Sequence, residues 1–489
     1  MLRHQPPAFR KLVTHRLAKS IDMKIEQIYT GCLAQGAYYI EDSGEVAIID
    51  PLRESKPYIE KAQKEGAKIK YIFETHFHAD FVSGHVDLAA KTGATIVYGP
   101  NANTEFESHV AADGEVFEIG NLRMKVLHTP GHTMESTTFL LLDENGKEHA
   151  VFSGDTLFIG DVGRPDLAQK GDITQEDLAG FLYDSLRNKI MTLPDDVIVY
   201  PAHGAGSACG KNMSKETSDS LGNQKQHNYA LRANMTKAEF IKEVTDGLLP
   251  PPQYFAQNVA MNKSITTGVE DILKKGNVSL DVEAFEAMAN HDGALVLDTR
   301  SAQNFAEAHI PNSIFIGIDG GFAPWVGALI PDLQQPIIFI ADAGREEEVV
   351  TRLSRVGYDH TLGYLHGGLE AWTKAGKETD SVHSIPATDF AEAYGTDSLQ
   401  VMDVRKPGEY GAEHVKDAMN LPLDFINENM HKIQEDTTYH VHCAGGYRSM
   451  IACSILKSRG YHDLVDVKGG FKAIAETSVA TTEFVCPSG

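Results

Sequence analysis

The segment Thr75-His76-Phe77-His78-Ala79-Asp80 decides how the first half of this chain is interpreted. It directly follows the apolar stretch 71–73, which is typical of a β-strand. The segment places three potential metal ligands at alternating positions. Alternating side chains of an extended loop lie on the same side, so we expect His76, His78 and Asp80 to converge.

Three further clusters of this kind follow predicted strands. They are Thr129-Pro130-Gly131-His132-Thr133, Ser153-Gly154-Asp155-Thr156 and Pro201-Ala202-His203-Gly204. A strand end is a rigid place for a metal ligand. One cluster alone would also suit a hydrogen-bonded surface histidine, but four together predict a metal centre. The helical stretches between these strands predict a layered α/β domain over residues 23–249.

These motifs resemble the metallo-β-lactamase superfamily, whose signature is an HxHxDH segment followed by a distant His, Asp and His. The resemblance implies an αββα sandwich with the metal site at one sheet edge. Phe81 stands where dinuclear hydrolases carry the last histidine of the segment. A phenyl ring cannot ligate a metal, so a single metal is expected. Two His and one carboxylate suit non-haem Fe(II) and dioxygen chemistry, whereas a zinc hydrolase with a bridging hydroxide needs two filled sites.

Within the superfamily, the stretches 154–158 and 163–166 are similar to those of the persulfide dioxygenases, which use mononuclear iron. This resemblance implies that His76, His132 and Asp155 ligate one Fe(II). It also implies a set of residues that orient the ligands or line the substrate pocket, namely His78, Asp80, His203, Arg164 and Cys209. Whether His78 turns toward the metal stays open at this point.

The segment 204–211 contains Cys209 and is rich in glycine. Two interpretations are equally favoured: a loop that approaches the acidic groups of a thiol cofactor, and a loop with no ligand. Glutathione-using relatives usually carry a cysteine before the Gly-Arg pair and a tyrosine near the last histidine. Val162 and the pair 205–206 differ from that pattern, so the thiol carrier stays open.

After Pro250-Pro251-Pro252, which marks a linker, the chain repeats itself. The segment 297–300 (LDTR) matches 402–405 (MDVR), and a pair of glycines recurs at 367–368 and 469–470. A period of about 100 residues is typical of two tandem copies of one small domain. We therefore expect an N-terminal extension, a first domain, a linker and two further α/β domains, at 1–22, 23–249, 250–263, 264–378 and 384–489.

The second copy contains His442-Cys443-Ala444-Gly445-Gly446-Tyr447-Arg448 between a predicted strand and a predicted helix. Small residues let this loop curl its N–H groups toward the sulfur, and the helix N-terminus adds partial positive charge, so a thiolate is favoured. Arg448 supplies a cation for an anionic sulfur compound. The loop resembles that of a rhodanese domain, which implies that Cys443 and Arg448 are catalytic in sulfur transfer. Related phosphatases use a loop one residue longer.

The first copy lacks this thiol. Its corresponding loop, 341–348, has Asp342 in place of the cysteine and three glutamates that would repel anionic sulfur compounds. We expect an inactive domain that acts as a spacer or docking surface. Cys453 and Cys32 are expected to be packing or turn residues.

Composition limits the partners and the compartment. The net charge of −24 argues against nucleic acid, and no apolar run is long enough for a membrane span. Five cysteines, an odd and scattered set, favour a reducing compartment. Residues 1–22 form a basic amphipathic stretch, interpreted as an upstream start or a targeting segment. We predict a cytoplasmic homo-oligomer, or a mitochondrial matrix protein if this stretch is a targeting signal.

The sequence thus predicts an iron persulfide dioxygenase that oxidises a low-molecular-weight thiol persulfide with O2 to sulfite. Rhodanese sulfur transfer, with thiosulfate formed or used, would be coupled to it in sulfide detoxification. One alternative is a dinuclear zinc thioesterase of the hydroxyacylglutathione hydrolase type with an appended rhodanese. Another is a sulfur carrier or redox sensor without catalytic activity.

Overall fold

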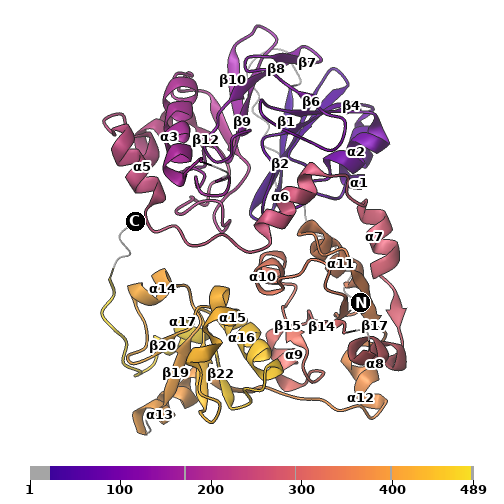
Figure 1. Cartoon of the computed structure of the whole chain (residues 1–489), viewed down its shortest axis with the longest axis vertical. Coiled ribbons are helices and arrows are strands. Elements are labelled where there is room, and N and C mark those ends of the chain that lie inside the picture. Colours follow the sequence, from indigo (N-terminus) through magenta and orange to yellow (C-terminus); the bar gives the residue numbers. More distant parts are fainter. Residues whose placement is uncertain (1–22, 170–171, 292, 397–398, 486–489) are drawn as a thin grey trace. The chain divides into compact units, whose positions relative to one another are not determined.

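The computed structural model describes residues 23–169, 172–291, 293–396 and 399–485 and forms two compact units (Figure 1). The first unit ends at Val269 and the second begins at Glu270. Within the described ranges, no helix is both long and apolar enough to cross a membrane. The extension 1–22 and Cys486 lie outside the described residues.

Two six-stranded sheets form the centre of the first unit. One has the order β1-β2-β3-β4-β5-β6, with β1 (Lys24–Thr30), β2 (Gln35–Asp42), β3 (Glu45–Ile49), β4 (Lys68–Glu74), β5 (Thr95–Tyr98) and β6 (His109–Val110). The other has the order β12-β11-β10-β9-β8-β7, with β7 (Val116–Ile119), β8 (Leu122–His128), β9 (Thr137–Leu142), β10 (Glu148–Gly154), β11 (Ile198–Pro201) and β12 (Asp219–Ser220). The strands predicted before the four polar clusters are all present.

The sheets pack face to face and helices cover their outer faces, which confirms the predicted αββα arrangement. Between the sheets, the rings of Phe73 on β4 and Phe139 on β9 lie 4.8 Å apart in a core drawn from both sheets. Separate apolar clusters join the helices to the outer face of each sheet. The helices of this unit are α1 (Lys56–Glu65), α2 (His85–Thr92), α3 (Gln175–Ser185), α4 (Leu221–His227), α5 (Lys237–Thr245) and α6 (Phe255–Lys263).

Parallel strand pairs bring the polar clusters to one edge of each sheet. In the first sheet β3 and β4 run parallel, and in the second sheet β10 and β11 do. The carboxyl ends of parallel neighbours meet at the same edge, and this is where ligands usually bind in α/β sheets. Asp50, His76, Asp155 and His203 follow these four strands.

Residues 250–263, expected as a linker, include helix α6 and belong to the first unit. The amide of Asn262 donates to the backbone oxygens of His78 and Phe81, each at 2.8 Å. Asn262 is buried, so its amide needs these partners, and they fix the path of the 75–81 loop.

The second unit contains two five-stranded parallel sheets with equivalent orders, β13-β17-β16-β14-β15 and β18-β22-β21-β19-β20. The first copy comprises α7 (Val269–Gly276), β13 (Ser279–Leu280), α8 (Val282–His291), β14 (Leu295–Asp298), α9 (Ala302–Glu307), β15 (Ile314–Phe315), α10 (Phe322–Leu329), β16 (Ile337–Ile340), α11 (Glu346–Arg355), β17 (Thr361–Leu365) and α12 (Gly368–Lys374). The second comprises β18 (His383–Pro386), α13 (Ala387–Thr396), β19 (Gln400–Asp403), α14 (Pro407–Ala412), β20 (Met419–Asn420), α15 (Ile426–Asn429), β21 (Tyr439–His442), α16 (Tyr447–Ser458), β22 (Leu464–Lys468) and α17 (Gly470–Ile474). The internal repeat predicted from the sequence is therefore a structural repeat.

Helix α16 of the second copy packs against the first copy. The hydroxyl of Tyr447 donates to the backbone oxygen of Gly317 at 2.7 Å, and the hydroxyl of Ser454 accepts from the N–H of Phe315 at 3.0 Å. All residues from Ser449 to Leu456 are buried, so both faces of this helix are covered.

Candidate functional site

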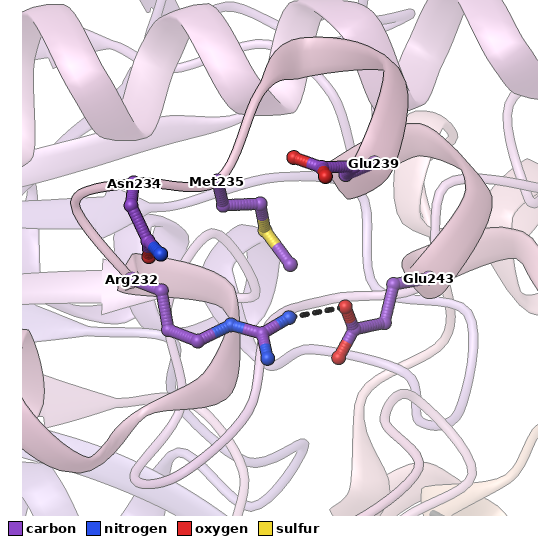
Figure 2. Close-up of a pocket in the computed structure, with 5 residues that line it drawn as sticks. All are labelled: Arg232, Asn234, Met235, Glu239 and Glu243. Atoms are coloured by element: carbon purple, nitrogen blue, oxygen red, sulfur yellow. Dashed lines mark hydrogen bonds and ion pairs between the residues drawn. The ribbon is translucent and has the colours of Figure 1, made fainter.

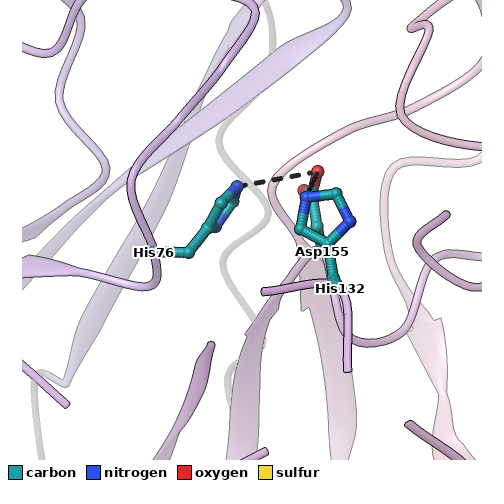
Figure 3. Close-up of side chains that lie close together, drawn as sticks. All are labelled: His76, His132 and Asp155. Carbon is teal, nitrogen blue, oxygen red and sulfur yellow. Dashed lines mark ion pairs between the residues drawn. The ribbon is translucent and has the colours of Figure 1, made fainter. Parts of the chain in front are cut away.

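Three predicted metal ligands converge between the two sheets of the first unit. The Nε2 atoms of His76 and His132 lie 3.8 and 3.4 Å from Oδ2 of Asp155 (Figure 3). One ligating atom from each of these side chains lies within 4.8 Å of the others, and all three side chains are buried. These residues come from the loops after β4, β8 and β10, which are far apart in the sequence.

The second ring nitrogen of each histidine has a partner that fixes the tautomer. Nδ1 of His132 lies 2.9 Å from the backbone oxygen of Arg164, which can only accept, so Nδ1 carries the proton. Nδ1 of His76 lies 2.9 Å from the hydroxyl of Thr75, which itself donates to Oδ2 of Asp50 at 2.8 Å. The Thr75 oxygen therefore accepts from His76. Both Nε2 atoms are left with a lone pair for a metal.

Asp155 supplies one oxygen to the group and is held through the other. Its Oδ1 lies 2.7 Å from Nδ1 of His203, while its Oδ2 is buried and takes no hydrogen bond from the described residues. Burial alone would raise the pKa of Asp155, but the neighbouring His203 and His76 hold that pKa well below its usual range. A buried carboxylate oxygen without a donor, facing two imidazole lone pairs, fits a metal cation.

His78 points away from this group. Its Nε2 lies 3.1 Å from Asp50 Oδ1 and 3.4 Å from Glu74 Oε2, and these three residues form a separate buried cluster. The ring of Phe81 packs on His78 with centroids 4.4 Å apart. His78 is therefore directed toward two carboxylates, and Phe81 fills the space beside it.

Asp80, His203 and Cys209 form a third buried cluster, again with ligating atoms within 4.8 Å of one another. Nε2 of His203 lies 2.8 Å from Asp80 Oδ2, so the His203 ring joins Asp80 to Asp155. Burial, together with the charges of Asp155 and Asp80, raises the pKa of the Cys209 thiol well above its usual value. Without a cation, Cys209 is a neutral thiol.

The guanidinium of Arg164 is committed to internal partners. It makes a bidentate pair with Asp166 at 2.7 Å and donates to the backbone oxygens of Ala208 and Leu249. The backbone N–H of Arg164 also donates to the backbone oxygen of Cys209 at 3.0 Å. Arg164 thus orients His132 through its backbone carbonyl. Its side chain fixes the surrounding loops.

A separate pocket lies beside α5 of the same unit (Figure 2). Five residues line it, and an ion pair joins two of them, Arg232 and Glu243. None of the predicted site residues is among the five: Arg232, Asn234, Met235, Glu239 and Glu243.

In the second unit, Cys443 follows β21 and lies at the base of a tight loop. Its Sγ accepts the N–H of Gly446 at 3.1 Å, directly before α16 begins at Tyr447. The N–H of Phe471 donates to the Cys443 oxygen at 2.6 Å. Gly470 has φ +58°, and a Cβ there would lie 2.3 Å from that oxygen. The second glycine of the repeated pair therefore allows α17 to approach the Cys443 loop.

Arg448, predicted as a cation for anionic sulfur compounds, is already paired. Its two terminal nitrogens donate to Glu409 at 2.6 and 2.8 Å, and Glu409 lies on α14. In the first copy the equivalent loop carries Asp342, which is exposed, and Arg345, which pairs with Asp319 and Glu348. Both arginines are held by carboxylates.

Several residues of these sites lie outside the motifs that the sequence displays. Asp50 is buried at the end of β3, and Glu74 ends β4, where a single acid follows an apolar strand. That pattern is a usable signal, because a buried carboxylate requires partners. Glu409 has no comparable signal, since its partner Arg448 is distant in the sequence.

Comparisons with known proteins agree with this architecture. The metallo-beta-lactamase superfamily matches residues 30–203, and the rhodanese-like domain matches residues 281–375 and 386–477. A probable hydroxyacylglutathione hydrolase of Schizosaccharomyces pombe is 30% identical over 206 residues, which cover 41% of this chain and 76% of that protein. The mitochondrial persulfide dioxygenase ETHE1 of Homo sapiens is 28% identical over 248 residues, which cover 50% of this chain and 89% of that protein.

A solved metallo-beta-lactamase structure from Staphylococcus aureus is 32% identical and superposes with a TM-score of 0.62. The superposition covers 71% of this chain and 99% of the Staphylococcus aureus chain. The group of His76, His132 and Asp155 is a metal-binding site compatible with this fold. The chain belongs to the metallo-beta-lactamase superfamily, and two rhodanese-like domains follow its metallo-beta-lactamase domain.

Proposed function

We propose that this protein is a mononuclear iron persulfide dioxygenase that releases sulfite and is coupled to sulfur transfer at Cys443. The observation that carries the proposal is the donor set: two imidazole nitrogens and one carboxylate oxygen, with His78 directed elsewhere. Two histidines and one carboxylate are the ligands of non-haem Fe(II) oxygenases. Similarity to persulfide dioxygenase ETHE1 adds support.

In this proposal His76, His132 and Asp155 hold one Fe(II). When bound, iron supplies the redox chemistry by which dioxygen oxidises the terminal sulfur of a persulfide. The balanced reaction is R–S–SH + O2 + H2O → R–SH + SO3²⁻ + 2H⁺. Both atoms of dioxygen go to the terminal sulfur, and the thiol is regenerated.

The chain's own residues prepare this centre. Thr75 and the Arg164 carbonyl set the tautomers of the two histidines, and His203 fixes the rotation of the Asp155 carboxylate. All three ligands are buried, which limits the access of water to the reacting sulfur. The substrate carrier is a low-molecular-weight thiol.

The second activity is exchange of sulfane sulfur at Cys443. A donor persulfide transfers sulfur by Cys443–S⁻ + R–S–S⁻ → Cys443–S–S⁻ + R–S⁻. Sulfite then accepts it, giving S–SO3²⁻ and Cys443–S⁻, and the reverse sequence uses thiosulfate. The Gly446 N–H and the start of α16 both favour negative charge on this sulfur.

Oxygen uptake tests the first activity. We expect the iron-loaded protein to consume one O2 per sulfite formed with glutathione persulfide, coenzyme A persulfide or another persulfide of a small panel. The apoprotein, prepared with a chelator, serves as the matched control. No uptake with any persulfide of the panel would overturn the dioxygenase proposal.

A second candidate is a dinuclear zinc thioesterase, favoured by the cluster of Asp80, His203 and Cys209 and by the similarity to hydroxyacylglutathione hydrolases. In that case Cys209 would supply the metal ligand that the phenyl ring of Phe81 cannot. Metal analysis separates the candidates: about two zinc ions per chain, with thioester hydrolysis and no oxygen uptake, would support the thioesterase.

A further inference from the structure

The bidentate pair between Arg448 and Glu409 restricts the arginine that follows the Cys443 loop. Both terminal nitrogens of Arg448 are used, at 2.6 and 2.8 Å, in the geometry that gives the strongest arginine–carboxylate contacts. The two side chains are only partly exposed, 17% and 37%. Burial would raise the pKa of Glu409, but Arg448 holds it below its usual value, so Glu409 is a carboxylate.

Glu409 is itself fixed in place. Its Oε2 accepts the backbone N–H of Lys406 at 3.1 Å, which caps the start of α14. Pro407 occupies the first turn of this helix and limits its backbone freedom. An anion that is to bind Arg448 must therefore separate it from a carboxylate that does not swing freely.

Asp424 and Arg405 are further side chains that act electrostatically on this pair. Asp424 also acts electrostatically on Arg448, and its Oδ2 is buried without a hydrogen bond from the described residues. Arg405 is buried and makes a bidentate contact with Asp403. With two arginines against three carboxylates, the formal sum of these five side chains is 2 − 3 = −1 before a Cys443 thiolate is counted.

Thiosulfate and sulfite bring two negative charges to the reacting end, whereas a persulfide anion brings one. A dianion experiences the stronger repulsion from Glu409 and Asp424 and gains most from a released Arg448. The backbone N–H of Gly446 remains directed at the sulfur for either type of donor.

We propose that Glu409 is a specificity-determining residue of the Cys443 site, which withholds Arg448 from dianionic sulfur compounds and so favours persulfides as donors. The inference rests on the proposed sulfur transfer at Cys443. The disfavoured reaction is Cys443–S⁻ + S–SO3²⁻ → Cys443–S–S⁻ + SO3²⁻, in which the bond between the two sulfurs of thiosulfate breaks and sulfite leaves with its electron pair.

Glu409→Gln tests the proposal, because glutamine keeps the shape and the cap at Lys406 but removes the charge. Sulfur transfer to cyanide is measured with thiosulfate and with glutathione persulfide as donors. We expect kcat/KM for thiosulfate to rise about fivefold to tenfold, mainly through KM, while the value for glutathione persulfide stays within about twofold. Glu428→Gln removes an exposed charge from the same domain and should change neither value.

Other results would overturn either the role of Glu409 or the sulfur-transfer function. A parallel fall with both donors in Glu409→Gln would show that Glu409 only positions Arg448, and would overturn the inference. If Glu409→Gln does not fold, Asp424→Asn provides a second measurement. We expect a smaller rise in kcat/KM for thiosulfate and none for glutathione persulfide. An unchanged kcat/KM for thiosulfate would overturn the inference. Absence of transfer with both donors in the unaltered protein would instead overturn the sulfur-transfer function.

Discussion

Nδ1 of His203 lies 2.7 Å from Oδ1 of Asp155, so the carboxylate that faces His76 and His132 is held from behind by a third imidazole. His203 is bound on its other side by Asp80, at 2.8 Å. Asp155 is therefore supported by a chain of side chains that links both sheets, since Asp80 lies in the loop after β4 of the first sheet and His203 follows β11 of the second.

Replacing His203 by Asn should weaken metal binding without unfolding the domain. Asp155 loses the partner that sets its rotation, and losses of this kind lower metal affinity by about 10–100-fold. Titration with Fe(II) under anaerobic conditions, in competition with a chelator, measures the change. His128→Asn is the control, since His128 is the last residue of β8 and contacts the Met134 backbone oxygen instead. Equal affinities in both variants would contradict the role given to His203.

The variant Thr75→Val keeps the volume of the side chain and removes its hydroxyl. The Nδ1–H of His76 then has no acceptor at Thr75, and Oδ2 of Asp50 loses its donor. We expect iron affinity to fall by about tenfold, with a matching loss of oxygen uptake at limiting iron. Thr92→Val, at the end of α2, removes a hydroxyl that donates to the Leu88 oxygen and accepts the N–H of Ala94, and serves as control. An unchanged affinity in Thr75→Val would mean that His76 needs no such orientation.

His132→Ala and Cys443→Ser should separate the two activities. The first removes a metal ligand and is expected to abolish oxygen uptake while thiosulfate–cyanide sulfur transfer continues. The second is expected to abolish that transfer and to preserve oxygen uptake. A chain that is only a sulfur carrier or sensor gives a different pattern, in which Cys443→Ser removes all function and His132→Ala removes none.

Gly470→Ala should damage the Cys443 loop. Alanine at this position is strained by the φ of +58°, and its Cβ would lie 2.3 Å from the Cys443 oxygen. We expect the free energy of unfolding to fall by about 1–3 kcal/mol and sulfur transfer to fall more than stability alone explains. Chemical denaturation and donor kinetics measure the two effects.

Gly460→Ala is the matched control for this variant. Gly460 has φ +95°, but a Cβ there would contact nothing within 4 Å. It therefore carries the backbone strain without the collision. If both variants lose equal sulfur-transfer activity, the close approach of α17 to the loop is unimportant.

The sequence predicted the convergence of the three candidate ligands because each one stands beside a strand in a short motif. His76, His132 and Asp155 come together as expected from the ends of their strands. The predicted repeat is visible in two sheets of equivalent order. These features depend on local patterns, which a single sequence displays.

Contacts between distant segments were not predictable in the same way. The pairing of Arg448 with Glu409 depends on where α14 lies, and the direction of His78 depends on Asp50 and Glu74 at two strand ends. The role of Asn262 in holding the 75–81 loop requires that α6 return to the first unit. Only the folded chain reveals these partners.

The contacts of helix α16 give the copy without the thiol a structural role. One helix begins at the end of the Cys443 loop, and both its faces are covered, partly by the neighbouring copy through Tyr447 and Ser454. We therefore expect the two copies to melt in a single cooperative transition. After a gene duplication, one of two domains can lose its reactive thiol and still be retained, because its surface completes the hydrophobic core of the other domain.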